Sequence, residues 1–235
     1  MTKICLCGSS GFALVGEKDE RLVGTCLACG LLQTLNPPAD YGTLYTEGDQ
    51  YHIERAGQTP YRDRFWHDHE VGLVRLRRHL HHALRWLDVG CANGGFLAVL
   101  RHHLNAQAEG LELNPAMAAW AAERTGLPVH TSWATVQGRF DIITYHDVIE
   151  HVENPVVELE RLHGYVRSGG LLVLDTPDIA AWHDPMTSHH MKPLEHLFLF
   201  TRETLNQVLV RAGWVAEAWE TPIPGKLVVY ARQAP

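Results

Sequence analysis

A glycine-rich turn between a short apolar stretch and a helical one constrains this chain more than any other feature. Residues 85–90 read as a short buried strand, residues 91–95 are Cys-Ala-Asn-Gly-Gly, and a helical run follows over 96–104. A strand, a tight glycine turn and a helix in this order begin the units that bind phosphates or nucleosides. The turn therefore predicts an α/β sheet with a ligand at the carboxyl ends of its strands.

Strand-like and helix-like segments alternate through the rest of the chain. The expected strands are 85–90, 108–113, 129–132, 140–147, 170–175, 214–220 and 226–232, and the expected helices are 61–83, 96–104, 115–124, 154–166 and 201–213. Such alternation predicts a Rossmann-like, mainly parallel seven-stranded sheet covered by helices on both faces. The hairpin formed by the last two segments makes the final strand antiparallel.

The N-terminal segment carries two cysteine pairs. Cys5 and Cys7 precede a stretch that alternates like a hairpin, and Cys26 and Cys29 follow it, so the layout is that of a zinc ribbon. Four thiolates would make a structural zinc site. The first pair has a one-residue spacer, shorter than the usual two to four, and a metal-free hairpin remains the alternative.

Two prolines after Asn36 end this module. We expect three parts: a zinc-ribbon-like module (1–36), a tyrosine-rich linker or cover (37–60) and a main domain (61–235). The cover would close a ligand cleft or simply pack between domains.

The second strand of the main domain ends in an acidic residue, Glu112, which lies 22 positions after Gly90. An acid at this distance can accept hydrogen bonds from ribose hydroxyls. The turn also aligns with the dinucleotide pattern G-x-G-x-x-G, but Ala92 places a methyl group where a pyrophosphate would need close approach. This substitution favours a nucleoside without phosphate over a nicotinamide dinucleotide.

Three motifs carry a resemblance to a known family: Leu87 to Phe96, Gly110 to Pro115 and Phe140 to Val152, continued by Gly169 to Pro177 and by Glu195 to Thr201 with Ala212 to Trp214. In order and spacing they resemble the class I S-adenosylmethionine-dependent methyltransferases, particularly small-molecule enzymes of the ubiquinone-biosynthesis type. The N-terminal cysteines resemble zinc-ribbon leaders found on some members. The match covers most of residues 85–215, with Ala92 in place of a usual glycine.

The resemblance implies S-adenosylmethionine as cofactor and assigns residues to its parts. The methionine end would be lined by Asp88, Gly90, Ala92 and Gly94, the ribose held by Glu112, the adenine placed near Asn114, Ser132 and Trp133, and the methyl group bordered by His146 and Asp147. Trp133 is equally well explained as an ordinary packing residue that does not contact the adenine.

A hydroxyl acceptor would need a base, and two histidines are the candidates. His196 and His151 each follow an acidic neighbour in segments expected at the carboxyl ends of the strands. Either would serve instead as a buried structural histidine, and a metal-assisted transfer using His189 and His190 beside His196 is a further alternative. Residues 178–200 form the expected acceptor lid.

Composition limits the partners. The net charge of −7 disfavours a polyanion such as nucleic acid, and no stretch is long and apolar enough for a membrane helix. The absence of an apolar leader predicts the cytoplasm. The sequence thus predicts methyl transfer to a small-molecule acceptor, by O- or C-methylation. The alternatives are an RNA or protein methyltransferase, a non-catalytic cofactor-binding module and an NAD-dependent reductase.

Overall fold

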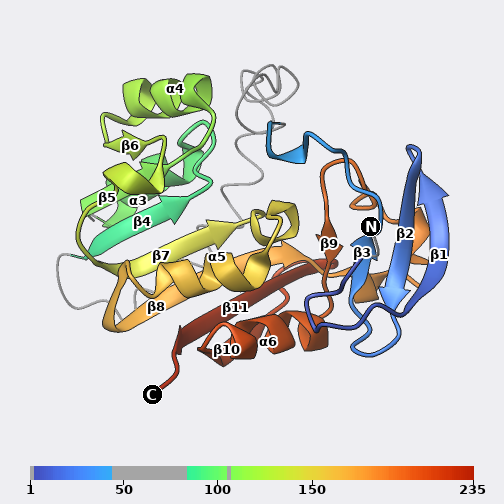
Figure 1. Ribbon diagram of the computed structural model, residues 1–235. Helices are drawn as coiled ribbons and strands as arrows, with labels where there is room; N and C mark the ends of the chain where they lie inside the picture. Colours follow the sequence, from blue (N-terminus) through green and yellow to red (C-terminus); the bar gives the residue numbers. More distant parts are fainter. Residues whose placement is uncertain (1–2, 44–83, 105–106) are drawn as a thin grey trace. The chain divides into compact units, whose positions relative to one another are not determined.

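The structure, a computed structural model, describes residues 3–43, 84–104 and 107–235 (Figure 1). Its main sheet has seven strands in the order β10-β11-β8-β7-β4-β5-β6. The contacts of the chain divide it into two units: residues 1–41, 146–164 and 172–235 form the first, and 42–145 with 165–171 form the second. The helix expected over 61–83 and most of the tyrosine-rich segment lie outside the described residues.

The second unit holds the glycine turn and the strands around it. Strand β4 (Arg85–Val89) runs parallel to β5 (Gln107–Leu111) and to β7 (Phe140–His146), and β5 runs parallel to β6 (Val129–His130). Four of the five β4 residues are buried, as expected of a central parallel strand. The turn and helix α3 (Gly95–Leu104) follow β4.

Helix α4 (Pro115–Thr125) has both ends defined by its sequence. The Asn114 side chain accepts hydrogen bonds from the backbone amides of Ala116 and Met117, and Pro115 occupies the first helical position. Gly126 ends the helix in the left-handed conformation, at φ 66°.

The first unit contains the C-terminal half of the fold. Helices α5 (Pro155–Leu162) and α6 (Arg202–Arg211) begin at the caps Asn154 and Thr201, and β11 (Lys226–Gln233) is antiparallel to both β10 (Trp214–Glu220) and β8 (Val166–Pro177). The last strand, β11, therefore runs antiparallel to both of its neighbours, which confirms the predicted topology. The fully buried Trp214 donates its indole proton to the carbonyl of Leu159, which fixes α5 against β10.

The region between helix α5 and strand β8 differs from the prediction. Helix α5 ends at Leu162, four residues before the expected end, and β8 already begins at Val166 rather than at Gly170. The amide of Phe140 donates to the carbonyl of Tyr165 at 2.7 Å, so this backbone is taken into pairing with β7. Sheet pairing therefore outweighs the helical periodicity of 163–166.

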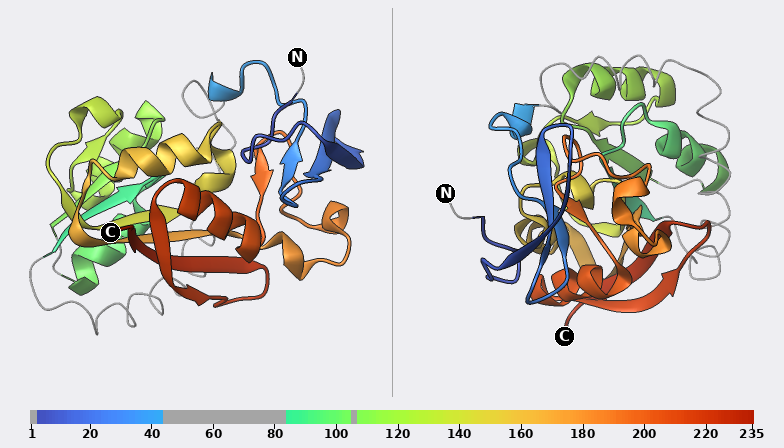
Figure 2. Two further views of the ribbon diagram at one scale, coloured as in Figure 1. Left: turned by 60° about the horizontal axis from the view of Figure 1, so that its bottom comes forward. Right: turned by 90° about the vertical axis from the view of Figure 1, so that its right-hand side faces the viewer.

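The N-terminal module also belongs to the first unit, where it shares a sheet with a distant segment. Strands β1 (Phe12–Lys18), β2 (Arg21–Cys26) and β3 (Leu32–Thr34) are antiparallel, and β3 pairs with β9 (Phe198–Leu199) (Figures 1 and 2). Five residues form the small core of this part: Val23, Leu32, Ile179, Met191 and Leu199. The module and residues 178–200, the segment expected to be an acceptor lid, thus form one structure.

Within the described residues, no helix combines the length and the apolar character that a membrane crossing requires.

Candidate functional site

The glycine turn is built from left-handed backbone. Gly90 and Gly94 have φ values of 71° and 73°, and Ala92 between them has φ 46°, which is strained for a residue with a Cβ. A Cβ at Gly94 would lie 2.9 Å from Cβ of Ala121 in α4, closer than packing allows. Close packing of the turn against α4 therefore requires glycine at position 94. At position 92 the turn carries only the methyl group of Ala92.

Glu112 connects this turn to the end of β5. Its Oε2 accepts from the backbone amide of Ala92 at 3.0 Å, and its Oε1 accepts from the amide of Asn114 at 2.9 Å. Burial raises the pKa of this carboxyl, and the amides of Asn114 and Ala92 oppose the rise. The carboxylate thus lies directly against the glycine turn.

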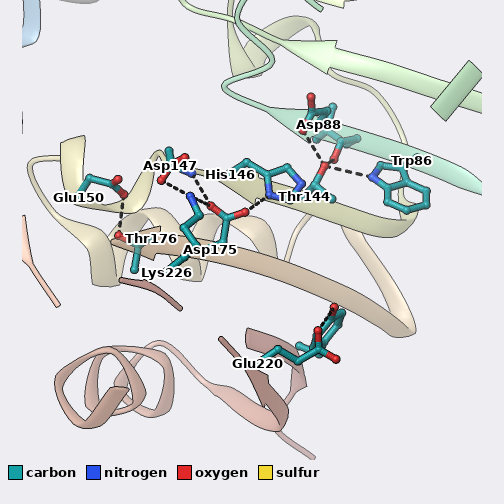
Figure 3. Close-up of polar contacts among 12 residues, drawn as sticks. Trp86, Asp88, Thr144, His146, Asp147, Glu150, Asp175, Thr176, Glu220 and Lys226 are labelled. Carbon is teal, nitrogen blue, oxygen red and sulfur yellow. Dashed lines mark hydrogen bonds and ion pairs between the residues drawn. The ribbon is translucent and has the colours of Figure 1, made fainter. Parts of the chain in front are cut away.

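The remaining predicted cofactor residues of the second unit have defined roles. Asp88, only 2% exposed, accepts from the Thr144 hydroxyl at 2.7 Å, and that hydroxyl accepts from the indole nitrogen of Trp86 (Figure 3). Asn114 caps α4, and Ser132 caps a short 3₁₀ turn that contains Trp133. The Trp133 ring lies 4.8 Å from that of Tyr165. These side chains fix local backbone as well as offering polar atoms.

His146 and Asp147 belong to the first unit, where they join a charge network. His146 Nδ1 pairs with Asp175, and Lys226 contacts both Asp147 and Asp175 (Figure 3). Burial lowers the pKa of Lys226, but the adjacent Asp147 and Asp175 outweigh this and raise it. Sequence reasoning missed Asp175 and Lys226, although Asp175 stands at the end of a predicted strand, a position that could have marked it.

The two candidate base histidines lie together. The rings of His151 and His196 are 4.7 Å apart, edge to face. His151 Nδ1 donates to the carbonyl of Glu195 at 2.9 Å, and His196 Nδ1 donates to the carbonyl of His190 at 2.8 Å. Burial, followed by the charge of His151, lowers the pKa of His196 well below its ordinary value. His196 is therefore neutral at neutral pH, with its lone pair on Nε2.

His189 and His190 have a different environment. Both rings pack against Trp182, at 5.3 and 5.6 Å, and the two rings are 3.9 Å apart. The part of His190 that contacts His196 by hydrogen bond is its backbone carbonyl. The alternative in which these two histidines bind a metal with His196 is therefore not favoured.

The four N-terminal cysteines converge despite the short first spacer. Their sulfur atoms all lie within 4.8 Å of one another, with Cys5 and Cys29 at 3.5 Å and Cys7 and Cys26 at 3.6 Å. A disulfide would bring sulfurs to about 2.05 Å, so these thiols are free. A tetrahedral zinc site with Zn–S bonds of about 2.3 Å places sulfurs about 3.8 Å apart, close to the observed spacing.

The geometry of the turns explains how Cys5 and Cys7 both reach the cluster although only one residue separates them. Gly8 and Gly30, each directly after the second cysteine of its pair, have φ values of 91° and 78°. Their amides donate to the carbonyls of Cys5 and Cys26 at 2.8 and 2.9 Å. Backbone amides also face the sulfur of Cys26; burial alone would raise its pKa, but the amides of Cys29 and Ala28 outweigh it and lower the pKa to about 6.

Thr34 connects the cysteine module to His196. Its hydroxyl donates to the carbonyl of His196 at 3.0 Å, and its amide donates to the carbonyl of Leu197 at 3.0 Å. Thr34 is fully buried. Thr34 therefore joins strand β3 directly to the segment that carries His196.

Comparison with known proteins adds a family match and related folds. Residues 53–218 match the model of a family described as methyltransferase domain. A ubiquinone biosynthesis O-methyltransferase of Ruegeria pomeroyi is 32% identical over 102 residues, which are 40% of this chain and 41% of that protein. The chain thus spans about two fifths of the length of this relative.

Solved structures share the fold at low sequence identity. The 1,6-didemethyltoxoflavin-N1-methyltransferase of Burkholderia thailandensis has a TM-score of 0.64 at 18% identity, covering 93% of this chain and 97% of that one. The magnesium protoporphyrin IX methyltransferase of Synechocystis PCC 6803 has a TM-score of 0.62 at 15% identity, covering 85% and 100%. Both neighbours confirm the predicted Rossmann-like sheet.

Proposed function

Because the chain belongs to the methyltransferase-domain family, as a class I S-adenosylmethionine-dependent enzyme, we propose that it transfers the methyl group to a small-molecule acceptor. The observation that carries the proposal is the Glu112 carboxylate, held at a turn without bulky side chains. The ubiquinone-biosynthesis relatives and the toxoflavin and porphyrin enzymes are named for small acceptors. The acidic net charge of −7 agrees with such an acceptor.

The residues of the second unit fit the cofactor. Gly90, Ala92 and Gly94 present backbone and one methyl group, so a methionine chain can approach the turn, with Asp88 beside it. In this proposal Glu112 accepts hydrogen bonds from the ribose hydroxyls, and the adenine lies near Asn114, Ser132 and Trp133. A bound S-adenosylmethionine supplies an electrophilic methyl group on a good leaving group, so orientation and water exclusion by the protein provide much of the rate.

The first unit supplies the acceptor side in this proposal. His146 is oriented by Asp175, and Asp147 by Lys226. These two residues border the methyl group. His196, with His151 as the second candidate, accepts the proton of an acceptor hydroxyl on Nε2, because its Nδ1 is already a donor. Residues 178–200 form the acceptor lid.

Replacing His196 with alanine is expected to lower kcat by roughly 100-fold or more, the usual contribution of a general base. The affinity for S-adenosylmethionine should stay within about twofold, because this proposal gives His196 a role toward the acceptor and none in holding the cofactor. Steady-state kinetics with calorimetry of cofactor binding measures both quantities. Unchanged turnover would remove His196 from the reaction.

Zinc bound by Cys5, Cys7, Cys26 and Cys29 forms the second part of the proposal. The spacing of the four sulfurs supports it, and the site is structural because all four positions are filled by protein. The metal would hold together a module with little apolar core of its own. Free thiols in such a cluster are typical of a reducing compartment, so we place the protein in the cytoplasm.

Replacing Cys26 with serine is expected to remove thiolate-bound metal and to lower the melting temperature by several degrees, since the module loses its cross-link. The Co²⁺-loaded wild type should show an intense near-ultraviolet thiolate-to-cobalt band, and Cys26→Ser should lose it. Cys91→Ala, which removes a buried thiol outside the cluster, is the matched control and should keep the band. A wild-type protein without the band would contradict the zinc assignment.

A further inference from the structure

The loop over residues 131–139, between β6 and β7, carries two of the residues that the proposed function places near the adenine, Ser132 and Trp133. The structure describes the whole loop, and Val136 is its one buried side chain. A segment with so little apolar packing is not held in one conformation by burial. Its polar contacts therefore decide where Trp133 lies.

Glu109 of β5 joins two side chains that reach this loop from opposite ends of the sheet. Arg85 is the first residue of β4 and His130 is the last of β6. Glu109 Oε1 accepts from the Arg85 guanidinium at 2.6 Å, and Oε2 accepts from His130 Nε2 at 3.0 Å. The three side chains are between 17% and 27% exposed. Partial burial makes these charge-assisted hydrogen bonds stronger and better defined than those of an exposed pair.

His130 holds the start of the loop. Its Nδ1 contacts the Thr135 hydroxyl at 3.1 Å, and that hydroxyl donates to the carbonyl of Ser132 at 2.9 Å. Ser132 and Thr135 are the cap and the last residue of the short 3₁₀ turn Trp133–Thr135. The turn is thus tied to β6 through one histidine ring.

Arg85 holds the end of the loop. Its guanidinium donates to the carbonyls of Gln137 at 3.2 Å and of Arg139 at 3.4 Å. Gly138 lies between them at φ 78°, and a Cβ there would lie 2.5 Å from a guanidinium nitrogen of Arg85. The backbone therefore passes against Arg85 at a point where only glycine fits.

Tyr165 adds a second contact to the same turn. Its hydroxyl donates to the carbonyl of Trp133 at 3.1 Å, and the two rings are 4.8 Å apart with 36° between their planes. Trp133 is still partly exposed. The indole is therefore fixed in position while part of its surface faces outward.

We propose that Glu109 is a positioning residue for cofactor binding, which acts through His130 and Arg85 on the loop that carries Trp133. The inference rests on the proposed function, in which the adenine lies beside this loop. Without Glu109 the loop would adopt several conformations. The affinity for the cofactor then falls in proportion to the fraction of the protein that keeps the binding conformation.

Calorimetric titration of the full chain with S-adenosylhomocysteine and with adenosine tests this role without an acceptor. Glu109→Gln keeps the size of the side chain but turns an amide donor toward one of the two N–H groups. It should weaken both ligands about tenfold and by the same factor. Equal losses place the defect on the adenosine part, whereas a general loosening of the unit would also disturb the glycine turn and weaken S-adenosylhomocysteine more. Adding His130→Ala to Glu109→Gln should cause little further loss, because both residues act along one path.

Arg167→Gln is the matched control. It removes an ion pair of the same unit, between Arg167 and Asp141 at 2.8 Å, and should bind both ligands as the wild type does. Thr135→Val serves where Glu109→Gln fails to fold, since Thr135 is exposed. It removes the hydroxyl between His130 and Ser132 and should weaken both ligands at least about threefold.

Two results would overturn the role of Glu109. One is a folded Glu109→Gln variant, or Thr135→Val in its place, that binds both ligands as tightly as the wild type. The other is an equal loss of affinity in Arg167→Gln. A wild-type protein that binds neither ligand would contradict the proposed function itself, and this inference with it.

Discussion

Replacing Glu112 with alanine is expected to abolish measurable binding of S-adenosylmethionine while the protein stays folded. The proposed ribose contacts are two hydrogen bonds to a charged acceptor, each contributing about 1.5–3 kcal/mol, so affinity should fall at least roughly 100-fold. The loss also releases the amides of Ala92 and Asn114, which Glu112 holds at 3.0 and 2.9 Å. Calorimetric titration measures the affinity, and circular dichroism reports the fold.

Glu123→Ala is the control for this prediction. Glu123 lies exposed on α4 in the same unit, so its replacement removes one negative charge without touching the turn. We expect its affinity to match that of the wild type. If Glu112→Ala binds the cofactor equally well, the ribose assignment is wrong.

Replacing Lys226 with methionine is expected to cost about 3–5 kcal/mol of unfolding free energy, the usual effect of removing one partner from a buried ion pair. The side chain of Lys226 is 13% exposed, and its removal takes from Asp147 and Asp175 the ammonium group that both carboxylates contact. The folded-state pKa of Lys226 is raised, so its contribution is complete below the ordinary lysine value of about 10.4. Urea unfolding between pH 7 and 9 should therefore give a constant difference.

Lys192→Met provides the comparison. Lys192 pairs with Glu195 at 3.5 Å with its side chain 36% exposed, so its loss should cost no more than about 1 kcal/mol. Equal effects of the two substitutions would show that the Lys226 network does not stabilise the first unit.

Local sequence signals predicted much of the fold because the chemistry that sets each boundary lies within a few residues of it. Asn114 with Pro115 fixes the start of α4, and Asn154 with Pro155 fixes that of α5. The same holds for the cysteine turns, where Gly8 and Gly30 adopt positive φ. The meeting of Glu112 with the glycine turn followed from the parallel order of β4 and β5.

Contacts between segments far apart in the chain could not be predicted from such local sequence signals. The pairing of β3 with β9 joins residues more than 160 positions apart. Strand β9 has only two residues, too few to show the alternation of apolar and polar side chains that predicts a strand. Lys226 resembles any lysine at the start of a strand until the fold brings it to Asp147 and Asp175. His151 and His196 were predicted as alternatives, and only the fold shows that they lie side by side.

Transfer of an isotopically labelled methyl group from S-adenosylmethionine tests the central claim most directly. The full chain is incubated with the labelled cofactor and separate panels of small hydroxylated molecules, RNA and proteins, and products are identified by mass spectrometry. We predict label in a small molecule, with an equal amount of S-adenosylhomocysteine released. Label found in RNA or protein, or a cofactor that is neither bound nor consumed, would contradict this function.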